Sequence, residues 1–74
     1  MGEKTRAVLV KIVEGEFPYL VFRVSSLPGQ SVTVSRKDWT DTDPRVGTEV
    51  VLSDLVRFEK GWRALKARYL KPDD

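Results

Sequence analysis

The chemically most distinctive stretch of the chain is its last regular segment, RFEKGWRALKARYLK, at positions 57–71. It carries six cations, three aromatic residues and only one acid. An aromatic ring can stack on a nucleobase while neighbouring cations contact phosphates, and such a stack contributes about 1–3 kcal/mol per base. Strand alternation predicts two rows in this segment, an inward row of Leu65, Ala67 and Tyr69 and an outward row of Trp62, Ala64, Lys66 and Arg68, with Arg63 at the turn.

These cations could instead pair with acids elsewhere in the fold. Positions 38–54 hold five acids and a single base, and Trp62 could then plug the core or one end of a barrel. Ion pairs on a surface contribute only about 0–1 kcal/mol each, so they explain little of this segregation of charge. The sequence therefore favours an anionic partner and leaves the pairing alternative open.

A second group of candidate side chains lies near the middle of the chain. Phe17, Tyr19 and Arg23 share one parity of a predicted strand, opposite an apolar row of Leu20, Phe22 and Val24. Rings in such positions can stack on bases, and a guanidinium can contact a phosphate or a base edge. Aromatic residues at strand ends also serve as lids of a core, and this alternative stays open.

Directly after the third predicted strand, Arg36 and Lys37 continue the cationic path. Trp39, in contrast, is expected to plug the bottom of a barrel. The acids that follow in DWTDTD are interpreted as turn formers and helix caps, because their spacing lacks the alternating ligands and central glycine of a calcium loop. We therefore predict no metal site.

Composition argues against an enzyme. The chain of 74 residues contains neither histidine nor cysteine. It therefore lacks the usual nucleophile–base pairs, an imidazole base near neutral pH and the common zinc ligands. Its glycines are single turn glycines rather than a phosphate-binding loop. We expect no catalytic residues and no cofactor.

Five short strands are predicted to position these residues. Alternating and β-branched runs separated by turn residues predict strands at 5–16, 18–26, 30–35, 48–58 and 62–70. Ser35 and Asp38 predict a capped helical turn after the third strand, which Pro44 ends. This order predicts an all-β protein, a small five-stranded OB-like barrel with a short helix or loop after strand 3, in a single domain over 1–74.

The strand order and several residues resemble bacterial translation initiation factor one over about positions 6–71. The matching residues are Phe22, Arg23 and Val24, Gly29, Gly47 to Val50, and Gly61 with Arg63, Arg68 and Tyr69. The resemblance implies an OB-fold that binds nucleic acid. Cold-shock domains are a second, less close resemblance, in which Phe17 and Tyr19 occupy the places of base-stacking aromatics. The third strand departs from that pattern, because SVTVSR has no outward aromatic residue.

We therefore expect binding of RNA or single-stranded DNA with low sequence specificity. The predicted contacts are stacking by Phe17, Tyr19 and Trp62, and phosphate contacts by Arg23, Arg36, Lys37, Arg63, Lys66 and Arg68. The alternative is a protein-interaction module, SH3-like or OB, whose basic face binds an acidic partner within a transcription or translation assembly. The sequence also predicts a cytoplasmic monomer with no membrane segment.

Overall fold

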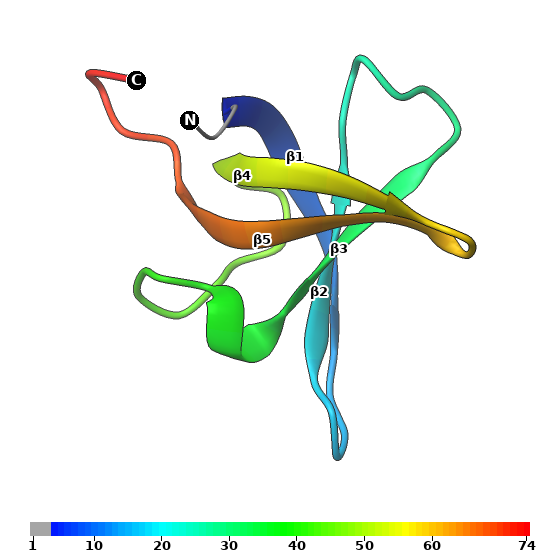
Figure 1. Cartoon of the computed structure of the whole chain (residues 1–74). Coiled ribbons are helices and arrows are strands. Elements are labelled where there is room, and N and C mark those ends of the chain that lie inside the picture. Colours follow the sequence, from blue (N-terminus) through cyan, green and yellow to red (C-terminus); the bar gives the residue numbers. More distant parts are fainter. Residues whose placement is uncertain (1–3) are drawn as a thin grey trace.

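The fold is a closed five-stranded β-barrel. The computed structural model describes residues 4–74; residues 1–3, part of the predicted domain, lie outside the described residues. The elements are β1 (Lys4–Val13), β2 (Tyr19–Arg23), β3 (Ser31–Ser35), the 3-10 turn η1 (Arg36–Asp38), β4 (Glu49–Phe58) and β5 (Gly61–Tyr69). Around the barrel the strands run β1-β2-β3-β5-β4 (Figure 1). The predicted all-β, OB-like architecture is confirmed.

Strand β1 is long enough to pair with two strands, β4 and β2. Its first half pairs with β4, from Lys4 to Val8, and its second half pairs with β2, up to Val13. The register with β2 shifts between Leu9 and Lys11. Such an irregularity bends a strand and increases its twist, which is how one strand can turn the corner of a small barrel. None of the described residues forms a helix long and apolar enough to span a membrane.

Two tight turns frame the part of the barrel that carries most candidate residues. In the β2–β3 connection, Gln30 N–H donates to the Leu27 carbonyl at 3.1 Å, and Gly29 has a φ of 76°. A proline followed by a glycine at positive φ is the signature of a type II turn. The β4–β5 hairpin pairs Phe58 with Gly61, so only two residues form its loop.

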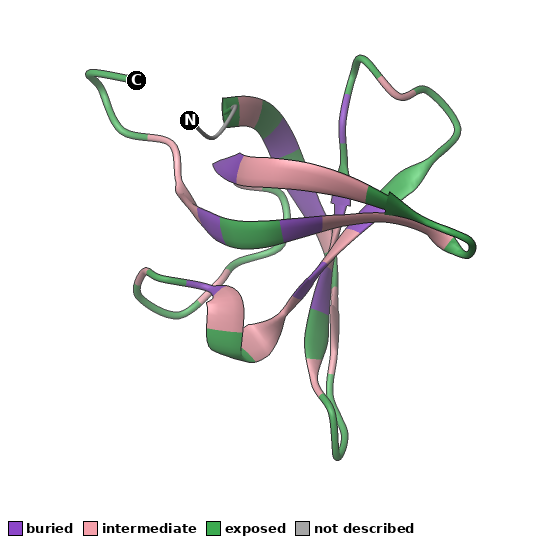
Figure 2. Cartoon of the chain, in the orientation of Figure 1, coloured by how far each residue is buried: buried purple, intermediate pink, exposed green. Residues whose placement is uncertain are grey.

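The interior is filled by the alternating apolar residues of every strand (Figure 2). The predicted inward rows of β2 and β3 are confirmed, and all their members are at most 1% exposed: Leu20, Phe22, Val24, Val32 and Val34. Each side chain of this size contributes about 1.5–3 kcal/mol when it is removed from water. A core of this kind holds the two strands as a rigid base for whatever lies on their outer face.

The alternation predicted for β5 is wrong in its first half. Leu65 is 48% exposed, whereas Ala64 is fully buried. The cause lies across the ladder, where Ser53 pairs with Lys66 and Leu55 pairs with Ala64, so Asp54 stands opposite Leu65. Asp54 has a φ of 58°, in the left-handed region, and this conformation interrupts the pleat of β4 at that point. The outward and inward faces of both strands therefore exchange here.

The acidic stretch after η1 has a structural role. Trp39 is 5% exposed and its ring lies edge-on to Tyr69, with ring centroids 4.9 Å apart, so the predicted plug is confirmed. Asp41 accepts hydrogen bonds from the backbone N–H of Thr42 at 2.8 Å and from that of Tyr69 at 3.2 Å. Ser35, the predicted cap, makes no side-chain hydrogen bond to the backbone of the turn, and a short 3-10 turn forms without one.

Replacement of Asp54 tests the origin of the exchange of faces. We expect Asp54→Val to lower the free energy of unfolding by about 1–2 kcal/mol, because a β-branched residue tolerates positive φ poorly. Asp54→Gly should keep or raise stability, since glycine adopts this conformation freely. Urea denaturation followed by circular dichroism measures both. Ser53→Val, one position earlier in an extended strand, is the control, and equal losses at the two positions would contradict this account.

Candidate functional site

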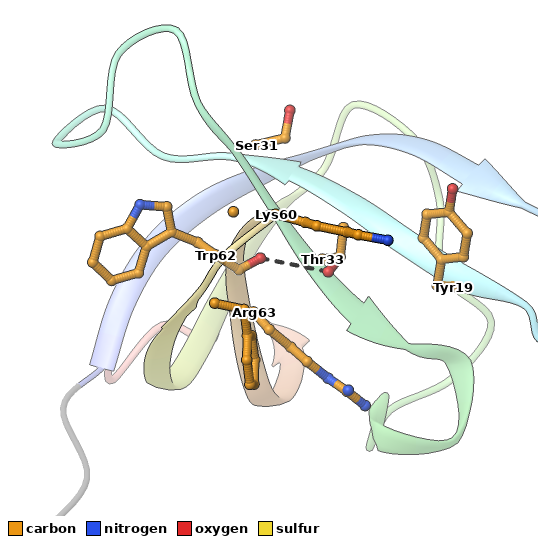
Figure 3. Close-up of a pocket in the computed structure, with 8 residues that line it drawn as sticks. Tyr19, Ser31, Thr33, Lys60, Trp62 and Arg63 are labelled. Atoms are coloured by element: carbon orange, nitrogen blue, oxygen red, sulfur yellow. Dashed lines mark hydrogen bonds between the residues drawn. The ribbon is translucent and has the colours of Figure 1, made fainter.

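A groove crosses the outer surface where β2, β3 and the β4–β5 hairpin meet. It has a volume of about 440 Å³ and is lined by Tyr19, Ser31, Thr33, Phe58, Lys60, Gly61, Trp62 and Arg63. Small hydroxyl side chains of β3 separate Tyr19 from the hairpin residues, and Lys60 extends across β3 in the direction of Tyr19 (Figure 3). The groove therefore presents aromatic walls, polar hydroxyls and two cations in one place.

Trp62 has both a structural role and an accessible surface. It packs against the core cluster, yet it also lines the groove. Its indole Nε1 donates a hydrogen bond of 2.7 Å to Oε1 of Gln30, which comes from the β2–β3 turn. The sequence left open whether Trp62 packs in the core or is exposed. In the structure one part of the side chain packs against the core and another part lines the groove. The hydrogen bond holds the ring in one orientation before any ligand arrives.

Arg63 is held along the edge of β3. Its guanidinium donates to Oγ of Ser35 at 3.2 Å and lies 3.9 Å from the carboxylate of Asp38. The parallel register places Arg63 beside Thr33, in the middle of the groove. This partly exposed ion pair is weak by itself, but it orients the guanidinium and reduces its net positive field.

A second hollow continues from the groove at the end of β3. Its volume is about 470 Å³ and its lining residues are Glu16, Phe17, Pro18, Ser35, Arg36 and Lys37. Phe17 is 83% exposed, and the N–H of Arg36 donates to the Pro18 carbonyl at 3.0 Å, which ties the β1–β2 loop to η1. Since Tyr19 pairs with Ser35, the groove and the hollow meet at this rung.

The predicted site residues therefore fall into three groups. Tyr19, Trp62 and Arg63 line the groove, and Phe17, Arg36 and Lys37 line the hollow. The remaining three, Arg23, Lys66 and Arg68, line neither. The single outward row predicted for Trp62, Lys66 and Arg68 does not form, because the exchange of faces at Leu65 separates Trp62 from the other two.

Sequence reasoning missed part of the groove. Lys60 and Phe58 in the β4–β5 hairpin, with Ser31 and Thr33 on β3, line it alongside the predicted residues. The loop between strands 4 and 5 belongs to the usual ligand surface of OB-folds, so the turn EKG was an available signal for Lys60. The hydroxyl residues of β3 carried no such signal, because small polar side chains are ordinary on an outer face.

The positive charge of this surface is smaller than the sequence suggests. Arg36 is 3.6 Å from Asp43, and Arg63 is paired with Asp38. Over residues 4–74, Lys60 and Lys37 take part in no ion pair. In the same range no cluster of acidic side chains could hold a metal ion. The lysines are thus the cations most available to an incoming anion.

Comparison with protein-family models, with curated proteins and with solved structures gave no match to this chain. The resemblances to initiation factor one and to cold-shock domains therefore stay predictions. The strand order and the closure of the barrel support the OB-like fold, and the lining residues define the groove.

The Gln30–Trp62 hydrogen bond can be tested directly. We expect Gln30→Ala to shift the indole N–H resonance of Trp62 and to increase quenching of its fluorescence by acrylamide, because the ring loses its anchor. The free energy of unfolding should change by less than about 0.5 kcal/mol, since Gln30 is a surface residue. Gln30→Glu keeps the acceptor oxygen and serves as the control. An unchanged indole resonance in Gln30→Ala would contradict the anchoring role.

Proposed function

We propose that the protein binds single-stranded nucleic acid, RNA or DNA, with low sequence specificity, through the groove and the adjoining hollow. The observation that carries this proposal is the groove itself, in which Tyr19 and Trp62 flank the hydroxyls of β3 and Lys60 reaches over them. Its position is also informative. In OB-folds the face of strands 2 and 3, with the loops between strands 1–2 and 4–5, is the surface that binds oligonucleotides.

Low specificity follows from the kinds of side chain present. Aromatic stacking accepts every base, because every base has a π-face. Reading of sequence needs fixed hydrogen-bonding groups aimed at base edges. In the groove, the Trp62 indole N–H is already bonded to Gln30, and Arg63 is bonded to Ser35. The Thr33 hydroxyl also donates within the protein, to the Trp62 carbonyl at 3.4 Å. The groups left for a ligand are the rings, the Ser31 and Tyr19 hydroxyls and the flexible lysine.

Tyr19 is the residue on which stacking can best be tested. It is 39% exposed, so Tyr19→Ala should leave the barrel folded. We expect this variant to lose about 1–3 kcal/mol of binding free energy, which corresponds to about 5- to 150-fold in affinity for an oligothymidylate. Fluorescence anisotropy of a labelled oligonucleotide measures the loss. Leu65→Ala, which removes an exposed apolar side chain outside the groove, should bind like the unaltered protein; equal affinities for all three proteins would count against stacking at Tyr19.

The contribution of charge is predicted to be modest. With Lys60 and Lys37 as the main phosphate contacts, the slope of log affinity against log salt should be about −1.4, and Lys60→Gln should reduce its magnitude by about 0.7. Lys11→Gln, an exposed lysine of β1 outside the groove, removes the same charge and should leave the slope unchanged. If both substitutions alter the slope equally, the effect belongs to net charge and the assignment to Lys60 fails.

An acidic protein partner is the second candidate for the same surface. Phe58 is 51% exposed at the tip of the hairpin beside Lys60, and an exposed aromatic next to a cation is common in protein interfaces. The two candidates differ in what Tyr19→Ala does. Loss of oligonucleotide binding supports the first, whereas loss of an acidic protein partner with no oligonucleotide binding in any variant supports the second.

A further inference from the structure

A second cationic surface lies on the outer side of β1, β4 and β5, away from the groove. Two rungs of the sheet, separated by one rung, each place a cation on β1 and a cation on β5 around one residue of β4. Lys4, Ser53 and Lys66 form one rung, and Arg6, Val51 and Arg68 form the next. Strand spacing puts the cations of a rung about 10 Å apart and these two rungs about 7 Å apart. We call Lys4, Arg6, Lys66 and Arg68 the outer cationic face.

Nothing in the folding of the sheet requires this arrangement. Like charges on neighbouring positions of a sheet repel each other and lower stability. Lys4 and Lys66 are in no ion pair within the described part of the chain, and both are exposed. Lys4 and Lys66 therefore leave positive charge on this face that no ion pair of the described residues neutralises.

The free protein itself supplies an anion to this face. The C-terminal segment leaves β5 and turns back toward the beginning of β1 (Figure 1). Both oxygens of the Asp74 carboxylate accept hydrogen bonds from Arg68, at 2.7 and 2.8 Å, and one of them also accepts the backbone N–H of Lys71 at 2.7 Å. Arg6 donates to the main-chain oxygen of Asp74 at 3.4 Å. These contacts form a specific clasp over the arginine rung.

The geometry of the clasp is that of an occupied anion site. The side chain of Asp74 is only 13% exposed, and that of Arg68 is 24% exposed. The hydrogen bonds from Arg68 and from Lys71 N–H hold the pKa of Asp74 far below its ordinary value, so the carboxylate stays charged at neutral and mildly acidic pH. A space of about 330 Å³ remains beside it, lined by Lys4, Arg6, Val51 and the tail acids among others. The guanidinium of an arginine can donate two parallel hydrogen bonds to a phosphate, as it does to a carboxylate.

We propose that the outer cationic face is a second contact site for the phosphate backbone of nucleic acid, and that Asp74 occupies it in the free protein as an intramolecular competitor. The proposal rests on the proposed function for the nature of the ligand, but it uses a different face and different residues. It assigns a role to Lys66 and Arg68, which the groove leaves out. Displacement of the tail would release Arg6 and Arg68 together from their contacts with Asp74.

The test is removal of the competing carboxylate. Asp74→Asn should raise affinity for an oligonucleotide of about 10–16 nucleotides by about three- to tenfold at low salt, and should steepen the salt dependence by about 0.7 for each phosphate gained. Amide resonances of Arg6 and Arg68 should shift on titration. The gain should persist in combination with Tyr19→Ala, which affects only the groove, and should vanish when Arg68→Gln is added.

Asp73→Asn is the matched control, because it removes the same charge from the same tail. Asp73 lines the space beside the clasp, but within residues 4–74 it makes no ion pair with an arginine. Equal gains from Asp73→Asn and Asp74→Asn would overturn the proposal in favour of a general charge effect. No gain from Asp74→Asn, while the unaltered protein still binds through Tyr19, would overturn the second site and leave the proposed function standing. Absence of binding in every variant at low salt would overturn both.

Discussion

Closure of the barrel depends on the few residues that attach the chain after β3 to the second half of β5. The parallel ladder between β3 and β5 has only two rungs, ending at Thr33 and Arg63. Beyond them, Thr40 N–H donates to the Ala67 carbonyl at 2.9 Å, Asp41 accepts the N–H of Tyr69, and the Trp39 ring lies against that of Tyr69. Backbone groups of β5 would otherwise lack partners on this side, and unpaired buried groups are costly. The groove lies beside the paired rungs, so its shape depends on this seam.

The interruption at Asp54 divides β5 into two halves with opposite alternation of inward and outward residues. Before Leu65, the strand contributes Trp62 and Arg63 to the groove, and after it Lys66 and Arg68 lie on the outer surface beside β4, outside the groove. A regular strand would have kept all these residues on two uninterrupted rows. A single residue at positive φ therefore lets one basic strand serve two surfaces, at a conformational cost of about 1–2 kcal/mol.

Much of the fold could be predicted because local patterns and tertiary structure agree. In β2, buried Leu20 and Phe22 alternate with more exposed residues. This alternation, the β-branched residues of β3 and the turn glycines each predict the structure that the barrel has. The exchange of faces could not be predicted, since an aspartate within a strand gives no sign of its φ angle. Nor could the clasp of Asp74 on Arg68, because it depends on the path of a tail that has no periodic pattern. The sequence predicted the kinds of residue in the site and part of its location. Only the structure showed that the predicted residues lie on separate surfaces.

The charges of the chain are distributed by residue type as well as by position. In each of the three surfaces the arginines are engaged within the protein: Arg63 in the groove, Arg36 in the hollow, and Arg6 and Arg68 on the outer face. The lysines of the same surfaces take part in no ion pair within residues 4–74: Lys60, Lys37, Lys4 and Lys66. The planar fork of arginine suits fixed, directional contacts, whereas the hydrated ammonium of lysine on a flexible stem suits contacts that form and break. The pairing alternative raised by the sequence thus applies to Arg36, Arg63 and Arg68, which contact acids of the fold. The lysines are the cations that our proposal assigns to an anionic ligand.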